Sequence, residues 1–177
     1  DLYDPIFISD IHRFTEARNL KGEAWEGPGL DVANVKYVIG TNSMRYRKLE
    51  LENEIDGIKI YRNKDCPGRI WFSSKPVFAR NHEEAWELTK KSVPGSTLVL
   101  ETEAETVTGA RNVNPKYSIK LEWNEPRLLK FSVLTDTAGY VYVADAWYPG
   151  WKAKVDGAEK PILRANYAYR AVELNAG

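Results

Sequence analysis

The chain has 177 residues, enough for one domain or two small ones with a proper hydrophobic core. Its 25 Lys and Arg residues balance its 25 Asp and Glu residues, and this zero formal charge argues against nucleic acid or anionic lipid as the main partner. A single cysteine, Cys66, excludes an intramolecular disulfide and a multi-cysteine metal site. No apolar run approaches the ~20 residues that a membrane-spanning helix needs.

The first half of the chain mixes helix and strand signals. Ser9 can cap a helix over residues 10–19. Asn81 and Glu84 form a pair typical of a capping box, which predicts a second helix that ends near residue 91. Short apolar runs predict strands, and Asp56-Gly57 is a turn signal between two of them. These strands are expected at 35–39, 48–51, 58–61, 70–72, 77–79 and 97–101.

After residue 115 the pattern is entirely β. Residues 117–123 alternate apolar and polar, so Trp123 is expected on a buried face, where it would remove ~150–250 Å² from water. Further strands are predicted at 129–133 and 140–144. Several short antiparallel strands separated by turns favour a sandwich. The polar segment 103–115 has no clear period and is the candidate boundary between two lobes.

The fold class predicted from these signals is α+β. We expect a mixed α/β N-terminal lobe over residues 1–108, followed by an antiparallel β-sandwich-like C-terminal lobe over residues 109–177.

A β-hairpin is predicted close to the end of the chain. Pro149-Gly150 breaks the preceding strand, and an alternating segment begins at Trp151. Asp156-Gly157 tolerates the positive φ of a two-residue type I′ turn. Pro161 lacks an N–H for the ladder, which places the return strand at an edge.

Chemistry-bearing motifs are scarce. The chain has no Walker loop, no GxGxxG and no nucleophile elbow. Its two histidines, His12 and His82, are expected to be surface or capping residues, and Cys66 an incidental loop thiol. The alternating glutamates that begin at Glu101 are expected on the solvated side of a strand. We therefore predict no catalytic residue, no cofactor and no metal ion.

Aromatic residues near the hairpin are the strongest binding candidates. They come from adjacent β segments and have amide and guanidinium groups beside them, with Asp145 nearby in sequence. Such a combination suits sugar rings, which offer C–H faces and hydroxyls, although aromatic residues in sheets more often fill cores. The glycan-binding candidates are Trp147, Tyr148, Trp151, Arg164, Asn166, Tyr167 and Arg170.

Several short pieces of the same region also indicate a family. They are YPGWK at 148–152, VDG at 155–157, Pro161, RANY at 164–167 and RAV at 170–172. Two earlier pieces, NVKYVI at 34–39 and IYRN at 60–63, keep the same order. Together they resemble the C-terminal extracytoplasmic region of the bacterial YfhO-like membrane proteins. One departure is Pro67-Gly68-Arg69, in which a glycine separates the proline from an arginine that would be expected to follow it directly.

The resemblance implies a polytopic parent protein that looks like a glycosyltransferase using lipid-linked sugar donors. The present chain would lie on the extracytoplasmic face of the bacterial membrane, periplasmic or external, anchored through transmembrane helices that precede it. Both ends of the chain look cut from a longer polypeptide. Its partners would be the membrane-embedded portion of the same parent chain and a glycan or cell-envelope polymer, with no nucleic acid.

The function expected from the resemblance is non-catalytic. The catalytic acidic residues of that class are expected in the first extracytoplasmic loop, so none is carried over to this chain. The domain would cover the membrane-embedded active site and help to position a glycan or polymer acceptor. One alternative is a free-standing carbohydrate-binding module with a Trp/Tyr platform. Another is a small hydrolase that uses Asp10, His12 or a carboxylate.

Overall fold

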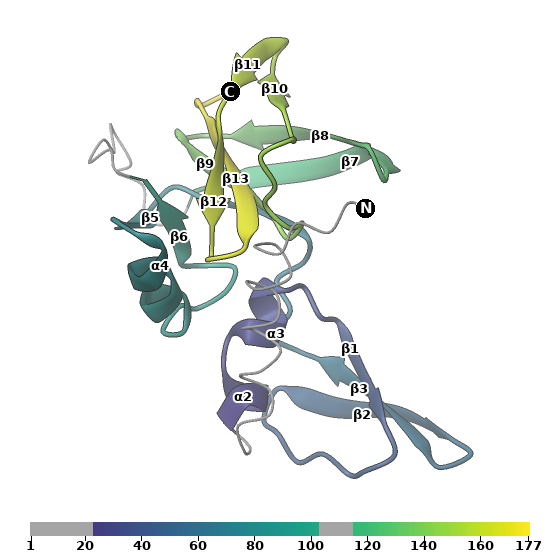
Figure 1. Ribbon diagram of the computed structural model, residues 1–177. Helices are drawn as coiled ribbons and strands as arrows, with labels where there is room; N and C mark the ends of the chain where they lie inside the picture. Colours follow the sequence, from purple (N-terminus) through teal and green to yellow (C-terminus); the bar gives the residue numbers. More distant parts are fainter. Residues whose placement is uncertain (1–22, 103–114) are drawn as a thin grey trace.

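The computed structural model describes residues 23–102 and 115–177, and shows a mostly β protein (Figure 1). The helix predicted over 10–19 and nearly all of the predicted boundary segment lie outside these ranges. The described helices are α2 (Glu23–Glu26), α3 (Gly29–Val32) and α4 (His82–Thr89). The strands are β1 (Tyr37–Gly40), β2 (Leu49–Ile55), β3 (Ile58–Asn63), β4 (Ile70–Ser73), β5 (Pro76–Ala79), β6 (Leu98–Glu101), β7 (Tyr117–Glu125), β8 (Leu128–Thr135), β9 (Gly139–Val143), β10 (Ala153–Val155), β11 (Ala158–Lys160), β12 (Ile162–Ala165) and β13 (Tyr169–Leu174).

A curled six-stranded sheet forms the centre of the protein, in the order β4-β9-β13-β12-β6-β5. It takes three strands from each side of the predicted boundary segment. Its pairs are antiparallel except β5 and β6, which run parallel and are connected through α4. The helix begins as the sequence predicts, because the Asn81 side chain accepts a hydrogen bond from the Glu84 amide at 2.9 Å. The Glu84 carboxylate accepts from the Arg80 amide at 2.7 Å. In a standard capping box it would instead accept from the amide of the N-cap residue, Asn81.

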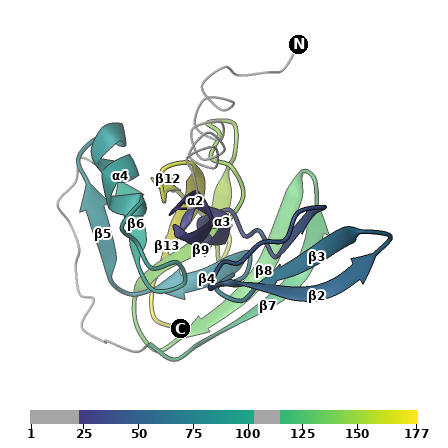
Figure 2. The same ribbon diagram turned by 90° about the horizontal axis from the view of Figure 1, so that it is seen from below.

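The two faces of this sheet carry separate apolar clusters. On one face, Trp71, Tyr142 and Leu100 belong to a buried cluster that includes Val32 of α3 and Trp86 of α4. On the other face, a second cluster is built from Phe72, Val141 and Leu174. The β7-β8 ribbon packs against this second cluster, and so does β10 (Figures 1 and 2). The apolar core is therefore layered about the central sheet.

A smaller sheet, in the order β1-β3-β2, carries its own apolar cluster. Leu30, Val38, Leu49 and Tyr61 are its buried members. Helix α3 contributes Leu30 to this cluster and Val32 to the core of the central sheet. The Tyr142 hydroxyl also donates to the Val32 carbonyl oxygen at 2.7 Å. The four-residue helix α3 thus contacts both sheets.

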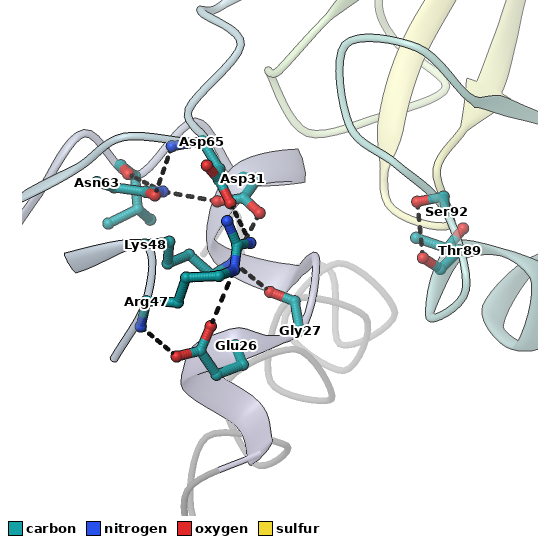
Figure 3. A network of polar contacts seen from close by, with 10 residues as sticks. Glu26, Gly27, Asp31, Arg47, Lys48, Asn63, Asp65, Thr89 and Ser92 are labelled. Carbon is teal, nitrogen blue, oxygen red and sulfur yellow. Dashed lines mark hydrogen bonds and ion pairs between the residues drawn. The ribbon is translucent and has the colours of Figure 1, made fainter. Parts of the chain in front are cut away.

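A buried ion pair fixes α3 to the small sheet (Figure 3). Lys48 is fully buried, and its Nζ lies 2.7 Å from Asp31 Oδ2. The other carboxylate oxygen of Asp31 accepts from the Asn63 amide at 2.6 Å. Arg47, which directly precedes Lys48, instead lies at the surface, where it contacts Asp65. Both oxygens of the buried carboxylate therefore have donors, as a charge in this position requires.

Both predicted Asp-Gly turns are confirmed. Asp56-Gly57 joins β2 to β3, and Asp156-Gly157 joins β10 to β11, with positive φ at all four residues. Pro161 lies between β11 and β12, outside either ladder.

The predicted burial of Trp123 is wrong. Its side chain is 53% exposed. The pairing register of β7 with β8 shifts between Leu121, opposite Phe131, and Trp123, opposite Lys130. An extra residue in one strand turns the following side chain to the other face, so Trp123 does not share the face of Ile119. That face contacts the central sheet through Ile119, whereas Trp123 points away from it.

Candidate ligand-binding site

A row of residues crosses the central sheet on the face that carries the second apolar cluster, and it begins at Ile70, which packs against that cluster. Paired residues in adjacent strands point to the same face of a sheet, so these side chains are neighbours. The row changes from apolar to charged as it crosses the strands. Its members, from β4 to β6, are Ile70, Val143, Arg170, Arg164 and Glu101.

The segment that follows β9 folds back over the two arginines. Its backbone is fixed by a hydrogen bond from the Trp147 amide to the Ala168 carbonyl oxygen at 2.8 Å. The Arg164 guanidinium lies 4.3 Å from the centre of the Trp147 ring, and the Arg170 guanidinium lies 4.2 Å from that of Trp151. These are cation–π distances. Each indole is therefore held by a cation that the sheet positions.

Asp145 accepts hydrogen bonds from two arginines. Arg69, which directly precedes β4, binds it through Nε at 2.8 Å and Nη2 at 2.9 Å. Arg170 donates its Nη2 to the same carboxylate at 2.6 Å. Arg69 also donates Nη1 to Asn124 of β7 at 2.7 Å. The hydrogen bond to Asp145 raises the pKa of Arg69, whereas burial lowers the pKa of Arg170.

His82 does not stand alone at the surface. Its Nδ1 lies 2.8 Å from Glu101 Oε2, and Arg164 Nη1 lies 3.1 Å from the same ring nitrogen. The imidazole stacks on the Tyr167 ring with 4.1 Å between centres. Both His82 and Glu101 are half-buried. The expectation of a solvated Glu101 is therefore corrected: its carboxylate orients the histidine at the first position of α4.

The seven candidate residues separate into two groups. Asn166 and Tyr167 are buried and have positive φ, forming the turn between β12 and β13. This turn is joined to β6 by two hydrogen bonds. The Asn166 side-chain oxygen accepts from the Val99 amide at 2.8 Å, and the backbone N–H of Asn166 donates to the Val99 carbonyl oxygen. The structure brings four of the remaining candidates together at the charged row: Trp147, Trp151, Arg164 and Arg170. Tyr148 is 41% exposed, and its carbonyl oxygen accepts from the Trp151 amide at 3.2 Å.

Three further residues complete this site, which we call the indole–arginine site. They are Arg69, Asn124 and Asp145. Asp145 was noticeable in the sequence beside the aromatic candidates. Arg69 was noted only with the departure at Gly68, and nothing local in the sequence links it to Asp145, which is 76 positions away.

Within residues 23–102 and 115–177, no group of three or more His, Cys, Asp or Glu residues is arranged to hold a metal ion. No helix in these same ranges has the length and apolar character to cross a membrane. Comparison of the chain with protein-family models, with curated proteins and with solved structures gives no match.

Proposed function

We propose that the chain is a non-catalytic extracytoplasmic domain of a multi-spanning membrane protein, one that resembles glycosyltransferases using lipid-linked sugars. Its role is to position a glycan or polymer acceptor for the membrane-embedded portion. The two-lobe organisation, with a sandwich-like second lobe, belongs to the same proposal. The resemblance in residues 148–172 supports the family assignment.

The observation that carries the ligand-binding part is the paired stacking of Trp147 on Arg164 and Trp151 on Arg170. Side chains that are already ordered lose little entropy when a ligand binds. Indole faces suit the C–H face of a sugar ring, and the neighbouring charged groups suit its hydroxyls. Tyr148, between the two tryptophans in sequence, is 41% exposed and adds an accessible ring.

A titration of the labelled chain with neutral oligosaccharides, followed by NMR of the indole N–H signals, tests this proposal. We expect the signals of Trp147 and Trp151 to shift. Tyr148→Ala should weaken binding about tenfold, since an aromatic contact contributes ~0.5–1.5 kcal/mol beyond its buried area. Tyr37 is the matched control because it is similarly exposed, at 43%, on the small sheet. An equal loss of sugar affinity in Tyr148→Ala and Tyr37→Ala would count against the proposal. So would indole N–H signals that do not shift with any sugar.

The location is tested separately from the ligand. An epitope inserted at the Asp156-Gly157 turn, which is exposed, reports the side of the membrane on which the domain lies. In the intact parent protein, an antibody should reach it in unpermeabilised protoplasts. Labelling that requires permeabilisation would place the domain in the cytoplasm and overturn this part of the proposal.

A free-standing carbohydrate-binding module would use the same site, and the two hypotheses differ in what they require of the parent protein. Deleting the domain from a membrane-bound parent should abolish glycan transfer if the domain positions the acceptor. Transfer that continues at an unchanged rate would favour an independent binding module.

The hydrolase alternative is favoured by one observation, the contact of His82 with Glu101. A histidine oriented by a carboxylate can take a proton from water. Asp10 and His12, named from the sequence, lie outside the described residues. If this alternative holds, the chain cleaves chromogenic esters or glycosides and His82→Gln abolishes the cleavage. Absence of turnover in the unmodified chain would end it.

A further inference from the structure

The indole–arginine site holds two guanidinium groups on one carboxylate. Among the described residues, Asp145 is the carboxylate that hydrogen-bonds to Arg69 and Arg170, and neither arginine has another acidic partner there. Arg69, Arg170 and Asp145 together therefore carry one excess positive charge. The chain as a whole has a formal charge of zero, so the excess positive charge is local to these three residues and does not reflect a generally basic protein.

Arg170 is held in a position that costs free energy unless its charge is well compensated. It is 7% exposed, and its Nε is buried with no hydrogen-bond partner in the described part of the chain. A charged group left with an unpaired donor in a buried position is destabilising. Burial lowers the pKa of this guanidinium, and repulsion from Arg69 lowers it further. A second anion beside Arg69 and Arg170 would relieve both costs.

Arg69 is the most accessible member of this group. Its side chain is 35% exposed and that of Asp145 is 22% exposed, whereas that of Arg170 is 9% exposed and its guanidinium lies 4.2 Å from the centre of the Trp151 ring. An approaching ligand would thus meet Arg69 first. Three of its five N–H donors bind Asp145 and Asn124, which leaves one donor on Nη1 and one on Nη2 for the ligand. Planar guanidinium groups bind two-oxygen anions in parallel hydrogen bonds, with more geometric specificity than an ammonium group.

We propose that the ligand of the indole–arginine site carries an oxyanion, a phosphate or a carboxylate, which binds at Arg69 and Arg170 while a sugar ring contacts the indoles. The saccharide part of this inference rests on the proposed function. Phosphate and carboxylate share the chemistry that a guanidinium fork recognises, so the oxyanion itself is the committed feature.

Calorimetric titration of the 177-residue chain with four probes tests this proposal: glucose, glucose 6-phosphate, glucuronate and inorganic phosphate. We expect glucose 6-phosphate and glucuronate to bind at least about tenfold more tightly than glucose, because charge-assisted hydrogen bonds are about twice as strong as neutral ones. The advantage should shrink as salt is raised, since Arg69 is partly exposed to solvent.

Arg69→Gln is the diagnostic variant, and Arg62→Gln is its matched control. Arg62 is also a partly exposed arginine paired with one carboxylate, that of Glu50 at 3.5 Å, but it belongs to β3 of the small sheet. Arg69→Gln should remove the preference for charged sugars, and Arg62→Gln should keep it. If Arg69→Gln does not fold, Arg69→Lys retains the charge and loses the fork, and it should lower the preference severalfold.

The outcomes separate this inference from the proposed function. Equal affinity for glucose and its charged derivatives overturns the oxyanion inference and leaves the glycan proposal intact. Inorganic phosphate that binds as tightly as glucose 6-phosphate, with glucose inactive, supports the oxyanion and removes the glycan. An unchanged preference in Arg69→Gln or Arg69→Lys, or an equal loss in Arg62→Gln, also overturns the inference.

Discussion

Arg164 and Arg170 lie directly opposite each other on the neighbouring strands β12 and β13. Like charges in this position repel and destabilise a sheet. Here each guanidinium stacks on an indole, and Arg170 is also hydrogen-bonded to Asp145. The pair is thus compatible with folding because the segment after β9 lies over it.

Removing the charge of Asp145 should therefore destabilise the fold. We expect Asp145→Asn to lower the free energy of unfolding by about 2–3 kcal/mol, the magnitude for hydrogen bonds to charged groups in a partly buried position. Urea denaturation measures the change. Glu159→Gln, on the exposed edge of β11, is the control and should stay within about 0.5 kcal/mol of the parent. Equal losses in the two variants would show that the arginines do not depend on Asp145.

The adjacent residues Lys48 and Arg47 offer a matched comparison of a buried and an exposed ion pair. Lys48→Met leaves the Asp31 carboxylate buried without its cation, which should cost about 3–5 kcal/mol of unfolding free energy. Arg47 has a 72% exposed side chain, so Arg47→Met should leave the unfolding free energy close to that of the parent. Urea unfolding of both variants is the measurement. A Lys48→Met variant as stable as Arg47→Met would contradict the burial of this pair.

Stability should fall at alkaline pH because of Tyr142. Burial is the main cause that raises the pKa of this phenol well above its ordinary value of about 10. The folded state holds the proton more tightly than the unfolded chain, so its stabilising contribution is complete below about pH 10 and is lost as pH rises from there through the folded pKa.

Denaturation at about pH 8 and about pH 11 measures this loss. Tyr142→Phe removes the titrating group, so the fall in unfolding free energy over this interval should be smaller than in the parent. The variant also loses its hydrogen bond to Val32, which should cost about 1 kcal/mol at neutral pH. Tyr37→Phe, at an exposed position, should keep the parent's pH dependence. Identical pH dependence in Tyr142→Phe and the parent would refute the assignment.

The two tryptophans of β4 and β7 should respond differently to truncation. Trp71 is 2% exposed within the main core, and Trp71→Ala should cost about 3–5 kcal/mol. Trp123 is 53% exposed, and Trp123→Ala should change the unfolding free energy by no more than about 1 kcal/mol. Thermal and urea unfolding give both values. A large loss of unfolding free energy in Trp123→Ala would mean that this side chain is buried, as the alternating pattern predicts.

Local features were predictable because the residues that specify them are close together in sequence. The Asp56-Gly57 and Asp156-Gly157 turns need positive φ, which Asp and Gly tolerate without help from the rest of the fold. The start of α4 follows in the same way from the side chain of Asn81 and the amide of Glu84. In each case the determining contact spans at most three residues.

Features that depend on distant partners were not predictable. Trp123 fits a period of two, but a register shift against β8 places it on the opposite face, and only the partner strand reveals such a shift. The central sheet places β4 beside β9, and periodicity does not choose between such pairings. Arg69 reaches the candidate site through that pairing, so no local signal could identify it.

Helix α3 has a consequence for how the protein unfolds. Leu30 and Val32 are two positions apart, yet they are buried in the clusters of two different sheets. Detaching either sheet would expose one of these side chains and also disturb the Asp31 ion pair between them. The backbone amides of both sheets should therefore exchange with solvent through the same global opening, so that the small sheet behaves as part of one cooperative unit.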